Sequence, residues 1–157
     1  MNLTIRPFCV ADATQIAILL KRIFLEINSK DYSIEQMEQL AAEYTPEKII
    51  EQASYAHTYV AEKAGHVIGT GTICPFWGSQ TESIILSLFV LPEFHGYGIG
   101  TAIMNYLEQD TFYIRANRIE IPASKTAEQF YLRLGYQAKN NEPTEDENGY
   151  LRMEKRR

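Results

Sequence analysis

The sequence predicts a mixed β-sheet with helices on both of its faces, in the α/β or α+β class. Apolar residues first recur at helical spacing, over residues 16–27. The pattern then changes to strand-like segments over residues 57–73. A strongly apolar segment, residues 83–90, leads through a glycine-rich turn at 96–100 directly into another helical pattern. With 157 residues and no internal repeat or linker, the chain 1–157 is predicted to form one domain around one core.

The first predicted elements are a strand and a long amphipathic helix. The strand covers Leu3–Arg6, and Pro7 ends it because proline cannot donate a hydrogen bond to a sheet. Asp12 stands where a side chain can cap the first turn of the helix. The apolar face of this helix, which has to be buried, is formed by Ile16, Leu19, Leu20, Ile23, Phe24 and Ile27.

A capping pattern and a proline predict where the next helical segments begin. Ser33 starts a second helix, and Gln36 follows three residues later, which is the spacing of a capping box. Thr45 and Pro46 start a further helical turn. Proline is well tolerated at the first helical position, because the N–H that it lacks would have no helical partner there.

The middle of the chain is predicted to hold three strands and one helix. Residues 57–62 and 67–73 form two strands around a turn at 63–66. The strand at 83–90 is so apolar that both of its faces must be covered. A single helix then runs from about 98 to 115. Its inward residues are expected to be Ile99, Ala102, Ile103, Tyr106 and Leu107.

The last third of the chain adds a strand, a helix and two strands. The strand at 118–121 is short, and Ser124 is expected to cap the helix that follows it. Gly135 marks the end of this helix. Residues 136–138 and 150–153 are the last strands, joined by a polar loop. Phe130 and Leu134 are expected to point inward from the helix.

Composition and charge argue against several classes of protein. Hydrophobic residues make up 45% and charged residues 22%, and no run of about 18 apolar residues predicts a membrane span. The N-terminal residues lack the pattern of a signal peptide, so the expected location is cytoplasmic. The net charge of −5 and a pI of about 5.2 disfavour a nucleic-acid partner, which usually requires a basic face.

Cysteine and histidine residues give no sign of a metal site. Cys9 and Cys74 are too few and too far apart for a disulfide scaffold or a cysteine-rich zinc site. Two free thiols in or near the core are expected instead. His57 and His66 stand at strand and turn positions, where structural roles are expected. The sequence therefore predicts no bound metal.

The segment Gly96-Tyr97-Gly98-Ile99-Gly100 requires a physical reason, since glycine costs a helix about 1 kcal/mol per residue. One reason is a ligand that approaches the backbone closely. Bare N–H groups at a helix start, with the positive end of the helix dipole, suit a pyrophosphate. The alternative is a tight turn with close helix–strand packing and no ligand.

Two common phosphate motifs are absent from this segment. The dinucleotide fingerprint G-x-G-x-x-G would need a glycine at position 101, where the chain has Thr101. A P-loop would need Gly-Lys followed by serine or threonine, and no such tripeptide occurs in the sequence. The glycine turn therefore belongs to neither class.

Two motifs resemble the GCN5-related N-acetyltransferase (GNAT) superfamily. Val90-Leu91-Pro92 followed by His95-Gly96-Tyr97-Gly98-Ile99-Gly100 is similar to the acyl-CoA-binding signature Arg/Gln-x-x-Gly-x-Gly/Ala. Phe130-Tyr131-Leu132-Arg133-Leu134-Gly135-Tyr136 is similar to the family's aromatic-Tyr-x-x-x-Gly-aromatic segment. The order of elements also matches the family across nearly the whole chain, which is identified as a small bacterial-type single-domain member. His95 departs from the signature, because arginine or glutamine is usual there.

The resemblance implies a fold and an activity. The expected sheet is mostly antiparallel, with six to seven strands flanked by about four helices. The expected reaction moves an acetyl group from acetyl-CoA directly to a primary amine of a small molecule or peptide, through a tetrahedral intermediate. Similar proteins often form homodimers, so a homodimer is compatible with the resemblance. The acceptor amine is not identified.

Binding and catalytic residues follow by matching motif positions. The backbone N–H of Phe89 or Val90 is implied to face the thioester carbonyl, and the amides of Val90 and Leu91 to face the pantetheine arm. Tyr131 matches a tyrosine that acts as general acid on the departing thiolate. The residues implied to bind acetyl-CoA are Leu88, Phe89, Val90, Leu91, His95, Gly96, Tyr97, Gly98, Ile99, Gly100, Thr101, Ser124 and Tyr131.

The general base has no clear candidate, since no carboxylate lies on the strand at 83–90. Glu82 and Glu120, either directly or through water, are the two tentative bases. The acceptor site is implied to form near Phe24–Tyr32, with Tyr44 and Trp77 as further candidates. Two readings compete with an enzyme, namely a non-catalytic acyl-CoA-binding regulatory module and a scaffold without a ligand.

Overall fold

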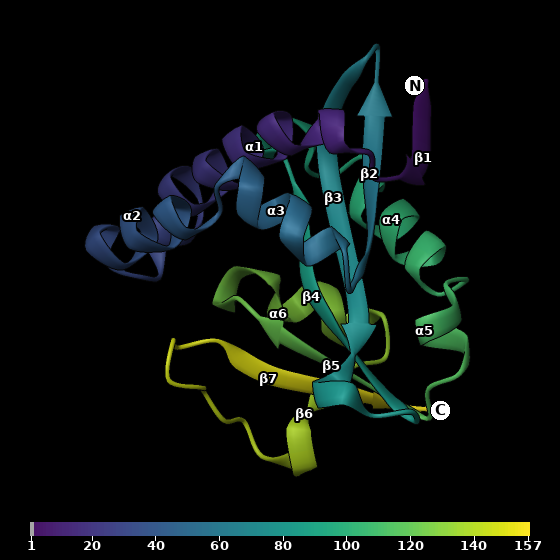
Figure 1. The fold of residues 1–157 in the computed structure, drawn as a ribbon. Coiled ribbons are helices and arrows are strands. Elements are labelled where there is room, and N and C mark those ends of the chain that lie inside the picture. The colour runs from purple at the N-terminus through teal and green to yellow at the C-terminus, as the bar shows by residue number, and fades with distance from the viewer. Residues whose placement is uncertain (1) are drawn as a thin grey trace.

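The computed structural model describes residues 2–157, and Met1, the first residue of the predicted domain, lies outside them. Seven strands form one sheet in the order β1-β2-β3-β4-β5-β7-β6. Every neighbouring pair is antiparallel except β4 and β5. This confirms the predicted class and the mostly antiparallel sheet (Figure 1). The strands are β1 Leu3–Pro7, β2 His57–Lys63, β3 His66–Pro75, β4 Glu82–Val90, β5 Arg118–Ala123, β6 Gln137–Ala138 and β7 Leu151–Arg156.

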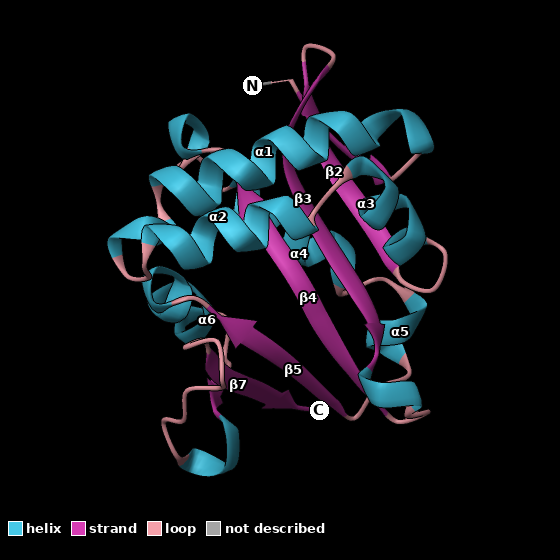
Figure 2. Ribbon diagram, turned by 60° about the vertical axis from the view of Figure 1, so that its left-hand side comes forward, coloured by secondary structure: helices cyan, strands magenta, loops and turns pink. Residues whose placement is uncertain are grey.

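Helices cover both faces of the sheet, as predicted. Side chains of α1, α2 and α3 form one apolar cluster, and those of α4, α5 and α6 pack into another on the opposite face. Figure 2 shows α1 to α3 in front of the strands and α4 behind them. The bounds are α1 Ala13–Glu26, α2 Ile34–Glu43, α3 Pro46–Ala53, α4 Ile99–Leu107, α5 Thr111–Ile114 and α6 Glu128–Arg133.

The cap predicted at Ser33 is confirmed, and the caps predicted at Asp12 and Ser124 are wrong. Thr45, which was expected only to start a helical turn, caps α3. Ser33 Oγ accepts a hydrogen bond from Gln36 N at 3.1 Å, and Thr45 Oγ1 accepts one from Lys48 N at 3.2 Å. Asp12 precedes α1 but does not cap it, because its carboxylate accepts hydrogen bonds from Arg6 and from the Cys9 N–H.

Ser124 likewise stands before a helical turn without capping it. Its side chain accepts no backbone hydrogen bond there. Its hydroxyl instead lies 3.3 Å from that of Thr126. Gly135, by contrast, ends α6 as predicted, in the left-handed region at φ +93°.

The single helix predicted over 98–115 is wrong, because the chain breaks it into α4 and α5. Asp110 has an extended backbone, and its carboxylate caps α5 by accepting from Phe112 N at 2.8 Å. The predicted inward face also needs correction. Tyr106 is 41% exposed, whereas Met104 is fully buried.

The two cysteines differ in their exposure to solvent. Cys74 is buried but Cys9 is exposed, so only one of the two thiols lies in the core. Both are free, as expected. Between residues 2 and 157, no helix is long and apolar enough to cross a membrane.

Candidate functional site

The site is a gap in the middle of the sheet. The parallel strands β4 and β5 are paired only from Glu82 to Ile84 and from Arg118 to Glu120. Beyond these residues the strands diverge, as Figure 2 shows. A cavity of about 700 Å³ lies there, lined by β4, the glycine turn, α6 and the end of α1. Its volume is typical of a site for a small organic ligand.

The glycine turn borders this cavity, and two of its glycines adopt conformations that favour glycine. Gly96 has φ +84° and Gly98 has φ +78°, both left-handed. A Cβ atom added to either would meet no atom within 4 Å, so both face open space. The first helical bond of α4 runs from Ala102 N to Gly98 O. The N–H groups of residues 99–101 therefore have no helical acceptor and are free to bind an anion.

Gly100 has a different role from its two neighbours. A Cβ atom there would lie 3.2 Å from Cζ of Phe130 on α6. The packing explanation therefore holds for Gly100, and the open approach to the backbone holds for Gly96 and Gly98. Sequence spacing alone could not separate the two roles.

The unpaired edge of β4 presents backbone groups to the cavity. Leu91 N donates to Ile68 O at 2.9 Å on β3. Because residues of an antiparallel pair alternate in direction, the N–H groups of Val90 and Leu88 point away from β3, toward the gap. The N–H of Phe89 points toward β3. Of the expected backbone donors, the Val90 N–H is thus available to a ligand. The expectation that the Leu91 amide faces the pantetheine arm is wrong, because this N–H already donates to Ile68 O.

A β-bulge changes the alternation of β4 just before this edge. Thr72 pairs with Ser87, and Ile73 pairs with Ile85, so Leu86 is an extra residue. A bulge reorients the residues that follow it. The bulge therefore helps to set which groups of β4 face the gap.

His95 lies at the cavity rim and holds the turn to β4. Its Nε2 lies 2.7 Å from Val90 O. Since a carbonyl oxygen only accepts, Nε2 must carry the hydrogen and donate it. His95 lines the cavity, whereas Tyr97 is 66% exposed and does not. The expected phosphate role of His95 stays a prediction.

Tyr131 reaches the cavity from α6. Its ring is buried and packs edge-on against Phe130 and Tyr136, which fixes its position. Burial raises the pKa of the Tyr131 hydroxyl above its ordinary value. This phenol therefore stays protonated at neutral pH and can act as a proton donor. Ser124 also lines the cavity.

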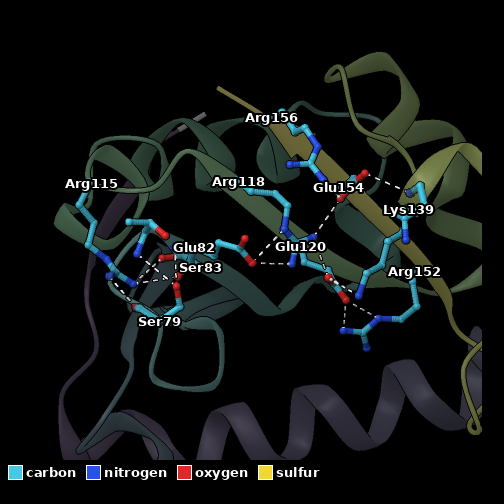
Figure 3. A network of polar contacts seen from close by, with 12 residues as sticks. Ser79, Glu82, Ser83, Arg115, Arg118, Glu120, Lys139, Arg152, Glu154 and Arg156 are labelled. Carbon is cyan, nitrogen blue, oxygen red and sulfur yellow. Dashed lines mark hydrogen bonds and ion pairs between the residues drawn. The ribbon is translucent and has the colours of Figure 1, made fainter.

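Neither tentative base lies in the cavity lining. Figure 3 shows the carboxylate of Glu120 among Arg118, Lys139 and Arg152, and Glu82 beside Arg118. Burial opposes the charged form of Glu120. Hydrogen bonds from Arg152, Lys139 and Arg118 outweigh it, and the pKa of the carboxyl lies below its usual value. A carboxylate so engaged is a poor base, and the structure brings neither glutamate to the site.

The far side of the cavity is formed by α1, α2 and Tyr150, the residue before β7. Phe24 packs edge-on against Phe89 with ring centroids 5.6 Å apart, and Tyr44 lies 5.8 Å from Phe24. Asn28, which lies within the expected acceptor range Phe24–Tyr32, also lines this side. So does Tyr150, which sequence reasoning did not single out as a site residue. Among the described residues, no acidic side chain lines the cavity.

The remaining residues that the sequence analysis considered lie outside the cavity lining. Trp77 is 85% exposed and is not part of the cavity lining. His57 Nδ1 lies 2.9 Å from the Asp110 carboxylate, which fits the expected structural role. His66 is exposed, and it is the first residue of β3 and not part of a turn. Within residues 2–157, no group of three or more His, Cys, Asp or Glu side chains could hold a metal ion.

Comparison with known proteins gives consistent matches. A family model described as an acetyltransferase (GNAT) domain matches residues 28–157. An uncharacterised N-acetyltransferase of Methanocaldococcus jannaschii is 39% identical over 95 residues, which make up 58% of this chain and 59% of that protein. The matched region thus spans about three fifths of the curated relative.

Solved structures share the fold along the whole chain. The PaiA N-acetyltransferase of Thermoplasma acidophilum, in complex with coenzyme A, superposes with a TM-score of 0.85 at 16% identity, covering 100% of both chains. A GCN5-related N-acetyltransferase of Rhodopseudomonas palustris gives 0.79 at 25% identity, covering 99% of this chain and 96% of that one. At 16% identity the first likeness shows the fold alone.

Proposed function

This chain belongs to the acetyltransferase (GNAT) family, and we propose that it moves an acetyl group from acetyl-CoA to a primary amine of a small molecule or peptide. One observation carries the proposal. A single cavity joins the free N–H groups after Gly98, the unpaired edge of β4 and the hydroxyl-bearing ring of Tyr131. A pyrophosphate, an amide-bearing arm and a leaving thiolate require these three features in that order.

The fit of acetyl-CoA rests on the shape and donors of the cavity. Gly96 and Gly98 leave open space where side chains would stand, and the N–H groups of residues 99–101 can hold the pyrophosphate. Leu88 and Val90 offer backbone groups along the gap. When bound, acetyl-CoA supplies an activated acyl thioester.

The chain's own residues then act on charge and protons. The Val90 N–H points into the gap, where it can stabilise negative charge that develops on the acyl oxygen. Tyr131 holds the proton that the departing sulfur needs, because its raised pKa keeps the hydroxyl neutral. Both groups are fixed by packing, which reduces the reorganisation that the reaction requires.

The apolar lining of the cavity helps the acceptor amine to lose its proton before the transfer. An alkyl ammonium has a pKa of about 10.4 in water, and an apolar environment lowers it by disfavouring the charge. The wall formed by Phe24, Phe89 and Tyr44 supplies such an environment. We infer that the released proton passes to water, because the carboxylates of Glu82 and Glu120 are held in ion pairs outside the cavity.

A binding and turnover experiment tests the proposal. Calorimetry measures acetyl-CoA binding, and a thiol reagent follows the release of CoA with a broad panel of amines, peptides and aminoglycosides. We expect binding, release with some amines, and a turnover rate at least about tenfold lower in Tyr131→Phe with unchanged acetyl-CoA affinity.

Each other outcome has a definite meaning. Binding without release across the panel would favour a non-catalytic acyl-CoA-binding module, which the absence of an acidic side chain from the described lining makes the second candidate. No calorimetric response would indicate a scaffold without this ligand. Normal turnover in Tyr131→Phe would remove the general-acid role.

A further inference from the structure

The end of α1 and the turn that follows it lie across the gap between β4 and β5. On one side of the gap, Phe24 packs edge-on against Phe89 of β4, with ring centroids 5.6 Å apart. On the other side, the hydroxyl of Tyr32 accepts a hydrogen bond from Lys125 N at 3.3 Å, just beyond the end of β5. Residues 25–31 therefore connect the two sides of the divided sheet along the cavity.

Lys30 stands in this connecting segment and lines the cavity. Its backbone belongs to a short helical turn in which Asp31 N donates to Asn28 O at 3.0 Å. The residues that flank it, Asn28 and Tyr32, are buried, whereas Lys30 itself is exposed. A lysine ammonium group sits on a flexible four-carbon stem. The turn thus fixes the base of the side chain at the cavity and leaves the amine free to move within it.

The ammonium group of Lys30 has no partner among the described residues, 2–157. Five of the seven lysines contact a carboxylate, a backbone carbonyl or an aromatic ring, namely Lys48, Lys63, Lys125, Lys139 and Lys155. Lys21 and Lys30 make no such contact within this range, and of these two only Lys30 lines the cavity. No carboxylate of the described lining competes for its amine.

The position of Lys30 makes it a tethered amine beside the site proposed for acetyl-CoA. The glycine turn and the edge of β4 would hold the cosubstrate with its acyl group in the gap that residues 25–31 cross. An amine linked to the same molecule reacts without a bimolecular encounter, and the effective concentration of such a group reaches the millimolar range or more. Lys30 can therefore compete with dissolved amines for the acetyl group.

We propose that Lys30 is a self-acetylation site, modified within the same molecule by bound acetyl-CoA. This inference rests on the proposed acetyl transfer and adds a residue of the chain as an acceptor. The ammonium group first releases a proton to water, and Lys30 Nζ then attacks the acetyl carbonyl carbon. The N–C bond forms and the C–S bond breaks. Tyr131 protonates the departing thiolate, and the proton that leaves the nitrogen replaces the one that Tyr131 gave.

Mass spectrometry of the intact protein and of its peptides tests the proposal. The protein is incubated with acetyl-CoA and no added amine, and the rate of acetylation is compared at Lys30 and Lys21. Lys21 is exposed and lies outside the cavity lining, so it reports the background of direct chemical acetylation. We expect Lys30 to be acetylated at least about tenfold faster than Lys21.

Further measurements separate transfer within one molecule from other routes. At saturating acetyl-CoA, the rate constant at Lys30 should not change when the protein is diluted tenfold. Excess CoA, which competes for the cosubstrate site, should slow acetylation of Lys30 but not of Lys21. Lys30→Arg keeps the positive charge and should remove the fast modification without changing the melting temperature. In Tyr131→Phe, acetylation of Lys30 should slow by the same factor as turnover of dissolved amines, since both release the same thiolate.

The results distinguish this inference from the proposed function. Equal rates at Lys30 and Lys21, a rate constant that rises with protein concentration, or no effect of CoA would overturn the inference. Turnover of dissolved amines with Lys30 left unmodified would also overturn it and leave acetyl transfer intact. Acetyl-CoA binding without transfer to Lys30 or to any amine would refute both.

Discussion

Replacing Glu120 by glutamine should destabilise the fold while leaving the chemistry of the cavity nearly unchanged. Glu120 is fully buried, and each of its oxygens accepts from cationic groups. Oε1 accepts from Arg118 Nη1 at 2.8 Å and from Lys139 Nζ at 3.0 Å. Oε2 accepts from Arg152 Nε at 2.7 Å and also from its Nη2. Glutamine keeps the shape, but it removes the charge and turns an amide donor toward one of these cations.

The size of the loss in stability depends on how well water or other carboxylates can stabilise the cations that Glu120 leaves unpaired. Removing one member of a buried ion pair typically costs about 3–5 kcal/mol. Here the side chains of Lys139 and Arg152 are 35% and 22% exposed and can be rehydrated, while Arg118 keeps Glu82 and Glu154. We therefore expect a loss of about 2–4 kcal/mol in the free energy of unfolding. For a chain of this length that lowers the melting temperature by about 4–16 °C.

Circular dichroism during heating and urea titration measures the change, with Glu93→Gln as the control. Glu93 also pairs with an arginine, Arg22, but its side chain is half exposed, so the midpoint should shift much less. Turnover measured well below the transition should stay within about threefold of the wild type, whereas loss of a general base typically costs about a hundredfold or more. Equal midpoints for the two variants, or a hundredfold loss of turnover with a normal midpoint, would refute the structural role of Glu120.

The same carboxylate predicts a pH dependence with a definite sign. Its pKa is lower in the folded chain than its unfolded value of about 4.3. The stabilisation is therefore fully present above that unfolded pKa and is lost as the pH falls through the folded pKa. The difference in melting temperature between wild type and Glu120→Gln should be largest near neutral pH and shrink on acidification below about pH 4. A difference that grows at acid pH would contradict this sign.

Two further substitutions test the turn and the core. His95→Ala should weaken acetyl-CoA binding less than about tenfold in calorimetry, because His95 Nε2 already donates to Val90 O and backbone groups hold the pyrophosphate. A hundredfold loss would show that the imidazole contacts a phosphate directly. Gly71→Ala should destabilise the fold by about 1–3 kcal/mol in urea titration, since its Cβ would lie 2.7 Å from Cγ2 of Ile103 on α4. An unchanged midpoint would mean that α4 can shift without cost.

Local patterns predicted much of the fold and part of the site. Ser33 caps its helix as expected, and Thr45 caps the helical turn expected after it, since a cap involves residues only three apart. Asp12 and Asp110 show the limit of this reasoning. Arg6 and Cys9 draw the Asp12 carboxylate away from α1, and Asp110 breaks a predicted helix while it binds His57. Such competition comes from the tertiary neighbours, which a capping pattern does not reveal.

Some residues of the candidate site could likewise be predicted from the sequence, and others could not. Gly96 and Gly98 could be found in the sequence, because a left-handed turn before a helix leaves few alternatives to glycine. The roles of Glu120 and Val90 could not be found there. They depend on which residues lie beside them in space, and the relevant partners come from distant elements.

The sequence by itself predicted most of the strands and helices and the glycine turn at 96–100, because periodicity and turn geometry act over a few neighbouring residues. The resemblance to a family motif pointed to Tyr131. Only the tertiary structure decided that β4 and β5 part after three residue pairs, and that α1 and the turn after it line the resulting cavity. The reason is physical. A gap in a sheet and the burial of a charge are properties of surfaces brought together from distant parts of the chain, and no local pattern encodes them.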